Sequence, residues 1–234
     1  MSSAVSGDAE RAAADATLVA ILRRMASPLR HDLAGALLVP RMRLQMLRRQ
    51  MQGNAPDAQR LLGSVDDALS ALDALRTVQI ATAGWLEQRD DAPLRLGDAL
   101  SAGVSSFGLP FSERGIPIEQ RSGDAIGSAC YTAQPLKLLL QAGFLLALDQ
   151  APPSGRLVVD CAADGQGARV QWRFEANDRG GATALAAGCS VPDRDRLTPA
   201  GVAALCRRFA ARFEPDPAVG TLHLAASSAL PSAT

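Results

Sequence analysis

Two long apolar patterns with helical spacing, joined by a short breaker, constrain the fold of this chain more than any other feature of its sequence. From Thr17 to Gln52, leucine, isoleucine and methionine recur mainly every three or four residues, which places them along one side of a helix. Gly53-Asn54-Ala55-Pro56 ends this pattern, and Asp57 opens a second one. Two long helices with a short connection form an antiparallel hairpin.

A hairpin of two helices cannot bury a broad apolar stripe alone. We therefore expect it to pair with a second copy of the chain, giving a homodimer with a four-helix bundle. The alternative is that the stripes pack on the remaining domain of the same chain. Ser27-Pro28 is expected to kink or restart the first helix, and Pro40 to bend it. Residues 1–15, which are small, polar and rich in alanine, are expected to be a flexible N-terminus.

The pattern changes after Asp90-Asp91-Ala92-Pro93, which predicts a linker and a second domain. In this part, short alternating runs typical of strands are interspersed with helical patterns. Strands are expected over 94–96, 116–120, 156–161, 168–175 and 220–225, and helices over 100–111, 134–149 and 199–213, the last one capped by Thr198. This order predicts a mixed sheet with helices on one face. The expected fold class is therefore α+β.

Composition excludes several classes of protein. The formal net charge is zero and aromatic residues make up 4% of the 234 residues, which argues against a nucleic-acid binder. The four cysteines are far apart, so their spacing suggests neither a zinc site nor a disulfide framework. The most apolar run, 136–148, is too short to span a bilayer, and the N-terminus does not resemble a signal peptide. We expect a soluble, cytoplasmic protein without a membrane partner.

The candidate functional residue is His31, inside the first helical pattern. It lies two positions from Leu29 and from Leu33, so it projects away from the apolar stripe. A histidine has a large neutral fraction at neutral pH, and a ring nitrogen of the neutral form is a nucleophile. Asp32, the next residue, is placed to orient the ring or to accept its proton. The alternatives are a merely solvated histidine, and a capping or dipole role for Asp32.

From about residue 20 to 226 the chain resembles the core of a bacterial two-component sensor histidine kinase. His31-Asp32-Leu33 is similar to the phosphoacceptor motif of that family's dimerisation hairpin. Three later stretches, 94–100, 113–116 and 151–156, are similar in order and spacing to landmarks of its ATP-binding domain. The resemblance implies domains over 16–90, for dimerisation and phosphoacceptance, and over 93–228, for an ATPase-like domain.

The nucleotide-binding residues of that family do not carry over. Leu146 stands where the family has an asparagine that binds Mg²⁺, and a leucine offers no oxygen to a hard cation. Ala176 stands in place of the aspartate that binds adenine, although Asp178 is close enough in sequence to compensate. The glycine pair of the family's lid has no clear counterpart in 197–205. A degenerate ATPase-like domain without a bound cofactor is expected.

A retained histidine beside a lost nucleotide pocket is similar to histidine phosphotransferases built on a kinase-like scaffold. The resemblance implies that His31 takes a phosphoryl group from the aspartate of one receiver domain and gives it to another, each receiver supplying its own Mg²⁺. The implied partners are response-regulator receiver domains and an upstream hybrid histidine kinase. Arg30, Ala34 and Gly35 are predicted to meet the receiver. The alternatives are a non-catalytic dimeric regulator that binds a receiver or a kinase, and an active kinase with a divergent pocket.

Overall fold

The chain divides into two compact units, and each is described by itself. The computed structural model describes residues 2–52, 57–86, 92–122, 129–165, 167–176, 191–216 and 219–225, although a few side chains in these ranges, those of His31 and Asp32 among them, lie outside the description. Residues 24–89 form the helical unit, and residues 1–23 together with 90–234 form the α/β unit. The predicted α+β class, with a helical N-terminal part and an α/β C-terminal part, is confirmed.

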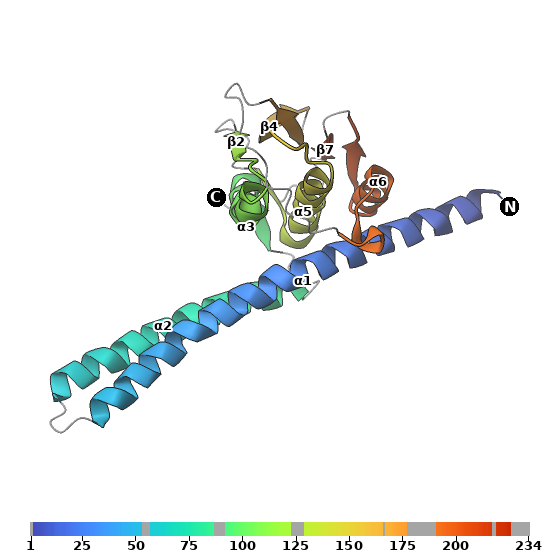
Figure 1. Ribbon diagram of the computed structural model, residues 1–234. Coiled ribbons are helices and arrows are strands. Elements are labelled where there is room, and N and C mark those ends of the chain that lie inside the picture. The colour runs from blue at the N-terminus through green and yellow to red at the C-terminus, as the bar shows by residue number, and fades with distance from the viewer. Residues whose placement is uncertain are drawn as a thin grey trace. The chain divides into compact units, whose positions relative to one another are not determined.

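The helical unit is the predicted hairpin, drawn in blue and cyan in Figure 1. It consists of α1 (Ser2–Met51) from residue 24 on and of α2 (Ala58–Leu86), whereas the first part of α1 belongs to the α/β unit. The second helix begins where the sequence predicts, because an Asp57 carboxylate oxygen accepts a hydrogen bond from the backbone N–H of Gln59 at 3.0 Å. This satisfies one of the amide donors that a helix start leaves unpaired.

The first helix differs from the expectation at two places. It is unbroken from Ser2 to Met51, so Ser27-Pro28 does not restart it. Residues 7–15 are helical where their composition predicts a flexible segment, because Ala14, Thr17, Ala20 and Ile21 are buried within the α/β unit. Burial of this apolar side supplies the stabilisation that the short polar sequence lacks by itself.

The two helices of the hairpin are joined by small and polar contacts as well as apolar ones. Pro40 on α1 and Ala68 on α2 are buried. The Ser64 hydroxyl donates a hydrogen bond to the Gln50 side chain at 2.8 Å, and Arg43 forms an ion pair with Asp67. Large apolar side chains nevertheless stay exposed along both helices, so the hairpin covers only part of its apolar surface.

The α/β unit has a mixed sheet with three helices on one side, as predicted (Figure 1). Its elements are β1 (Pro93–Arg95), α3 (Leu96–Ser112), β2 (Ile118–Ser122), β3 (Cys130–Thr132), α5 (Ala133–Asp149), β4 (Arg156–Asp164), β5 (Gly167–Glu175), η1 (Asp193–Asp195), α6 (Pro199–Arg208), β6 (Ala211–Glu214) and β7 (Gly220–Leu224). Among the described residues, five strands form one sheet in the order β2-β4-β5-β7-β6, and β1 pairs with β3 in a second, small sheet. Of the strand pairs described in the large sheet, β2–β4 is parallel and the others are antiparallel.

The core of this unit centres on α5, whose residues are buried on nearly every side. Phe144 stacks on Phe107 of α3, with ring centroids 5.1 Å apart, and meets the edge of Trp172 of β5 at 5.9 Å. Gly143 brings the helix close to the sheet, because a Cβ there would lie 2.4 Å from the Trp172 ring. The predicted buried helix over 134–149 is thus confirmed.

The last helix is shorter than the predicted range of 199–213. Thr198 caps α6 as expected, since its hydroxyl accepts a hydrogen bond from the Gly201 N–H at 3.1 Å. The helix ends at Arg208, however, and residues 211–214 form the edge strand β6 instead of a further turn. Ala210 adopts a left-handed backbone, with φ of 54°, which reverses the chain and starts the strand.

Candidate functional site

The candidate site lies on α1, where the predicted residues share one and a half turns of continuous helix. His31 and Asp32 are helical in their backbone, and nothing is described of their side chains. Arg30, Ala34 and Gly35 are exposed. Helical spacing puts Ala34 and Gly35 one turn after His31 and on its side of the helix. The fold thus brings these five residues to one stretch of helix, and their assigned roles stay predictions.

The helical phase of position 31 can be fixed against the residues that are buried in the hairpin. Pro40 comes nine residues later and therefore lies half a turn round the axis from residue 31. Pro40 is buried, and Leu33 and Leu47, which lie close to the phase of Pro40, are half-buried. The side of α1 that packs in the hairpin is therefore opposite residue 31, which sits on the outer side.

An apolar strip continues along this outer side, and it was not among the predicted site residues. Leu38, Met42 and Met46 follow His31 by seven, eleven and fifteen residues, so all three lie within about 60° of its phase. They are 54%, 53% and 55% exposed. The spacing of these three residues from His31 was the sequence signal that could have revealed the strip. The stronger leucine pattern on the opposite side of the helix obscured that signal. We call Ala34, Gly35, Leu38, Met42 and Met46 the outer strip.

A second exposed apolar surface lies elsewhere on the hairpin. Leu37 and Leu44 of α1 and Leu72 and Leu75 of α2 line a groove of about 410 Å³, together with Pro40, Arg41, Gln45 and Arg48. On α2, exposed apolar residues follow the three-and-four spacing of a helix–helix seam; these are Leu62, Val65, Leu69 and Leu72. Leu37 lies about 120° round α1 from residue 31. The groove and the seam, here called the seam surface, are therefore distinct from the outer strip.

Two arginines that follow Arg30 along this helix, Arg41 and Arg43, have positions that suggest support of the hairpin. Arg43 forms its ion pair with Asp67 of α2, and Arg41 lines the groove of the seam surface. Arg30 is exposed on the turn that holds His31. Of Arg30, Arg41 and Arg43, Arg30 is thus the one that is next to residue 31 in the sequence and has its side chain exposed there.

In the α/β unit, the positions that bind nucleotide in the resembled family hold groups unsuited to that task. Leu146 of α5 is fully buried in the core, where its side chain offers no ligand atom to Mg²⁺. Ala176 is exposed just after β5 and carries no carboxylate. Asp178, the candidate for compensation, lies outside the described residues. Residues 199–205 are part of α6.

The face of the large sheet away from the helices carries a network of charged residues. Glu175 of β5 is paired with Arg156 at 2.7 Å, with Arg173 at 3.0 Å and with Arg121 at 3.3 Å. Arg121 also pairs with Glu119 at 2.7 Å. The hydrogen bond from Arg156 and, after it, the positive charges of Arg121, Arg156 and Arg173 lower the pKa of Glu175 below its usual value of 4.5. Each charged group named here has a partner of opposite sign within the network, which is typical of a structural surface.

His223, Cys161 and Cys206 of the described residues have surroundings typical of structural side chains. His223 has Asp164 at 2.5 Å from Nδ1 and Glu214 at 3.5 Å from Nε2, in keeping with a structural side chain. Burial raises the pKa of Cys161 to about 11 and that of Cys206 to about 12, so both thiols are protonated and inert at neutral pH. In the described ranges, no three His, Cys, Asp or Glu residues gather where they could hold a metal ion. None of the helices described there combines the length and apolar character needed to cross a membrane.

Comparisons with known proteins give a fold-level likeness and no family. No protein-family model matches the chain, and no curated protein matches it. Among solved structures, it is similar to the histidine kinase AdeS of Acinetobacter baumannii, at 14% identity over 83% of this chain and 97% of that one, with a TM-score of 0.42. A histidine kinase of Burkholderia phymatum matches at 16% identity over 88% and 95%, with a TM-score of 0.42. A structure described as a bacterial phosphotransferase matches at 15% identity over 88% and 94%, with a TM-score of 0.39. At such scores these likenesses assign neither a family nor an activity.

Proposed function

We propose that this chain is a histidine phosphotransferase of a two-component phosphorelay, which passes a phosphoryl group between receiver-domain aspartates through His31 and does not use ATP. The observation that carries the proposal is the position of residue 31 on the outer side of α1, half a turn from buried Pro40. A phosphoacceptor must be reached by the active site of another protein. A residue on the packed side of the hairpin would not meet that condition.

The residues after His31 suit the close approach of a receiver. Ala34 and Gly35 are small and exposed, and a Cβ added at Gly35 would meet nothing within 4 Å. The surface next to His31 is therefore low and unobstructed. Beyond it, Leu38, Met42 and Met46 are each about half exposed and offer apolar area for docking. The flexible thioether side chains of the two methionines adapt to the shape of a partner.

The chemistry needs little from this chain beyond position and a free ring nitrogen. The imidazole nitrogen attacks the phosphorus of the receiver's aspartyl phosphate in line, the N–P bond forms, and the O–P bond breaks to leave the aspartate as a carboxylate. The reverse sequence delivers the group to a second receiver. The receiver's Mg²⁺ offsets the phosphoryl charge, and transfer depends mainly on positioning and electrostatics. Asp32 orients the ring or takes its proton, and Arg30 adds positive charge at the contact.

The α/β unit supports a reading without ATP. Leu146, buried in the core, offers no oxygen at the place where the resembled family binds Mg²⁺, and Ala176 offers no carboxylate where that family binds adenine. The first loss weakens binding of the metal ion and the second weakens binding of the nucleotide base. A cofactor on this chain is therefore not part of the proposal.

We also propose that the seam surface forms a homodimer. Leu62, Leu69 and Leu72 are 65%, 54% and 42% exposed in the single chain, and their spacing matches a helix–helix seam. Pairing two hairpins through this surface buries it in a four-helix bundle. The outer strip stays accessible in that arrangement because it lies on another side of α1.

The test is transfer of labelled phosphoryl from a panel of phosphorylated receiver domains to the purified chain. The proposal expects acid-labile label from at least one receiver, none from ATP alone, and none in His31→Ala. Label from ATP would establish a kinase instead. No transfer from any receiver, together with binding of a receiver that His31→Gln leaves intact, would establish the alternative, a non-catalytic regulator that uses the same apolar surface.

A further inference from the structure

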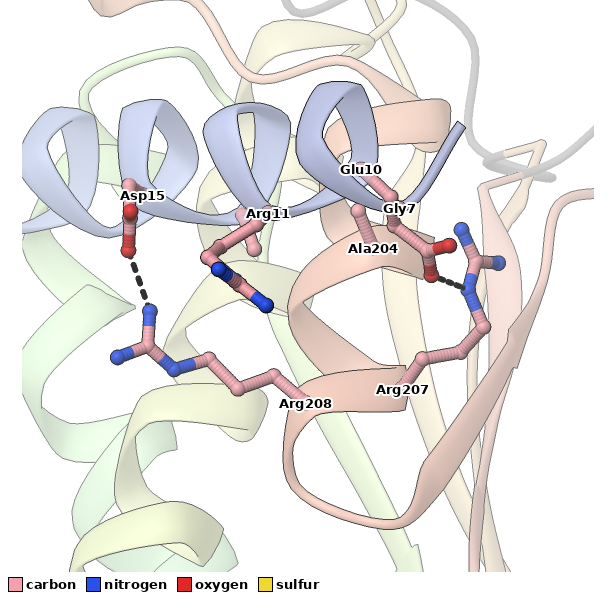
Figure 2. Close-up of a pocket in the computed structure, with 8 residues that line it drawn as sticks. Gly7, Glu10, Arg11, Asp15, Ala204, Arg207 and Arg208 are labelled. Atoms are coloured by element: carbon pink, nitrogen blue, oxygen red, sulfur yellow. Dashed lines mark hydrogen bonds and ion pairs between the residues drawn. The ribbon is translucent and has the colours of Figure 1, made fainter. Parts of the chain in front are cut away.

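The N-terminal part of α1 is attached to the α/β unit by contacts that the expected flexible segment would not make. Two ion pairs join it to α6, one between Glu10 and Arg207 and one between Asp15 and Arg208, as Figure 2 shows. A third joins Arg23 to Asp195 of η1 at 3.2 Å. We call residues 7–23 the N-terminal segment.

The N-terminal segment and α6 also fit each other in shape at one point. Thr17 is 6% exposed, and a Cβ at Gly201 of α6 would lie 2.4 Å from the Thr17 hydroxyl oxygen. Only glycine at position 201 leaves room for this threonine. The Thr17 hydroxyl donates to the Ala13 carbonyl of its own helix at 2.8 Å, so it needs no partner from α6.

The two halves of the segment are held differently. Toward its end, Thr17, Ala20 and Ile21 are buried, so apolar packing dominates there. Nearer the N-terminus, a cavity of about 360 Å³ opens between the segment and α6, lined in part by Arg11 and Ala204. In Figure 2 the Arg11 side chain extends into the space between the two ion pairs. This half is held across the cavity by ion pairs whose side chains are 42–57% exposed.

We propose that the N-terminal segment is an electrostatic latch on α6, which opens from its N-terminal end and restrains the helix that carries His31. Exposed ion pairs weaken with ionic strength, whereas the apolar contacts around Thr17 and Ile21 do not. The restraint follows from the continuity of α1 from Ser2 to Met51, since the latch and the candidate phosphoacceptor lie on one helix. This second part rests on the proposed function.

The first test is hydrogen exchange of the full chain, read by mass spectrometry over residues 7–23. Glu10→Arg with Asp15→Arg is expected to open the latch and to speed exchange of residues 10–15 by about 1.5- to 5-fold for each pair lost. Adding Arg207→Glu and Arg208→Glu is expected to restore slow exchange by reversing both pairs. Asp8→Arg is the matched control, because Asp8 is 82% exposed and its ion pair is with Arg11 of the same helix.

A steric variant tests the same contact without changing charge. Gly201→Ala is expected to open the segment, and adding Thr17→Ala to close it again, because that change removes the hydroxyl 2.4 Å from the new methyl and leaves the 3.1 Å approach to the Thr198 hydroxyl, which lies within the α/β unit's own α6 cap. Exchange over β4 and β5 reports whether the unit stays folded. Equal exchange over residues 7–23 in the wild type and in both opening variants, with β4 and β5 protected, would overturn the latch.

The second test measures phosphoryl transfer to His31 from a receiver that labels the wild type. The double charge reversal is expected to change the transfer rate at least twofold, and the fourfold swap to return it to the wild-type value. An unchanged rate in a variant whose segment exchanges fast would overturn the restraint on the phosphoacceptor helix. Absence of label in the wild type would instead count against the proposed function, and the exchange result would stand apart from it.

Discussion

Exchanging Met42 for glutamate should separate receiver docking from dimerisation. Met42 belongs to the outer strip and is 53% exposed, whereas Leu69 belongs to the seam surface and is 54% exposed. The two side chains are thus equally accessible in the single chain and lie on the same hairpin. The proposed function assigns them to different partners, so Met42→Glu should weaken receiver binding and Leu69→Glu should weaken the dimer.

The size of the effect follows from the area that each side chain has left to bury. Complete burial of a methionine side chain contributes about 1.5–3 kcal/mol, so the exposed half of Met42 offers about 1 kcal/mol to docking. Placing a carboxylate in that contact adds a desolvation cost of about 1–2 kcal/mol. We expect Met42→Glu to weaken receiver binding by about 2–3 kcal/mol, roughly 30- to 150-fold.

The assay is calorimetric titration with the receiver that labels the chain fastest, paired with light scattering of the free chain. Met42→Glu should lose receiver affinity and keep the mass of a dimer. Leu69→Glu should shift the chain toward monomer at the same concentration. Wild-type receiver affinity in Met42→Glu, or loss of the dimer in that variant, would refute the assignment of the two surfaces.

Two further predictions concern the stability of the α/β unit. Gly143→Ala should lower its melting temperature by about 4–8 °C, because overpacking against the buried Trp172 ring, 2.4 Å from the added Cβ, costs about 3 kcal/mol against a gain of about 1 kcal/mol in helix propensity. Gly108→Ala is the control and should raise the melting temperature slightly, because its Cβ would meet nothing within 4 Å. Equal melting temperatures of the two variants would contradict the packing described. For Glu175, whose pKa is lowered chiefly by the hydrogen bond from Arg156, the ion pairs contribute stability that is present above pH 4.5 and lost as the pH falls through the lower native pKa. Denaturant unfolding between pH 6 and 3 should therefore show a steeper loss of stability in the wild type than in Glu175→Gln, and parallel curves would contradict it.

The parts of the fold that the sequence predicts well are those with a strong local pattern. The helix over 134–149 is recognisable because it is apolar on nearly all sides. The start of α2 directly after Asp57 is recognisable because a capping residue follows a breaker. Edge strand β6 was missed because Ala211–Glu214 is four residues long and no glycine or proline separates it from the end of α6 at Arg208. The reversal depends on the left-handed backbone of Ala210, a conformation that alanine rarely adopts.

The sequence predicts where the candidate site lies on the first helix, but only some of the residues that surround it. The helical phase of His31 follows from the leucines around it, and Pro40 agrees with that phase. The outer strip was harder to find because Leu38, Met42 and Met46 interrupt a pattern that already accounts for a helix. The helical N-terminus could not be predicted locally, since Thr17 is buried against Gly201, which lies far along the sequence and supplies the space by lacking a side chain.

The most direct measurement is reconstitution of the relay with two receiver domains, one labelled and one unlabelled, and the purified chain at catalytic concentration. We expect label to move from the first receiver to the second only when the chain is present. Mass spectrometry of the trapped intermediate should place the phosphoryl group on His31. His31→Gln should stop the transfer and keep receiver binding. Movement of label at the same rate with His31→Gln, or a phosphoryl group found on another residue, would contradict the proposed function.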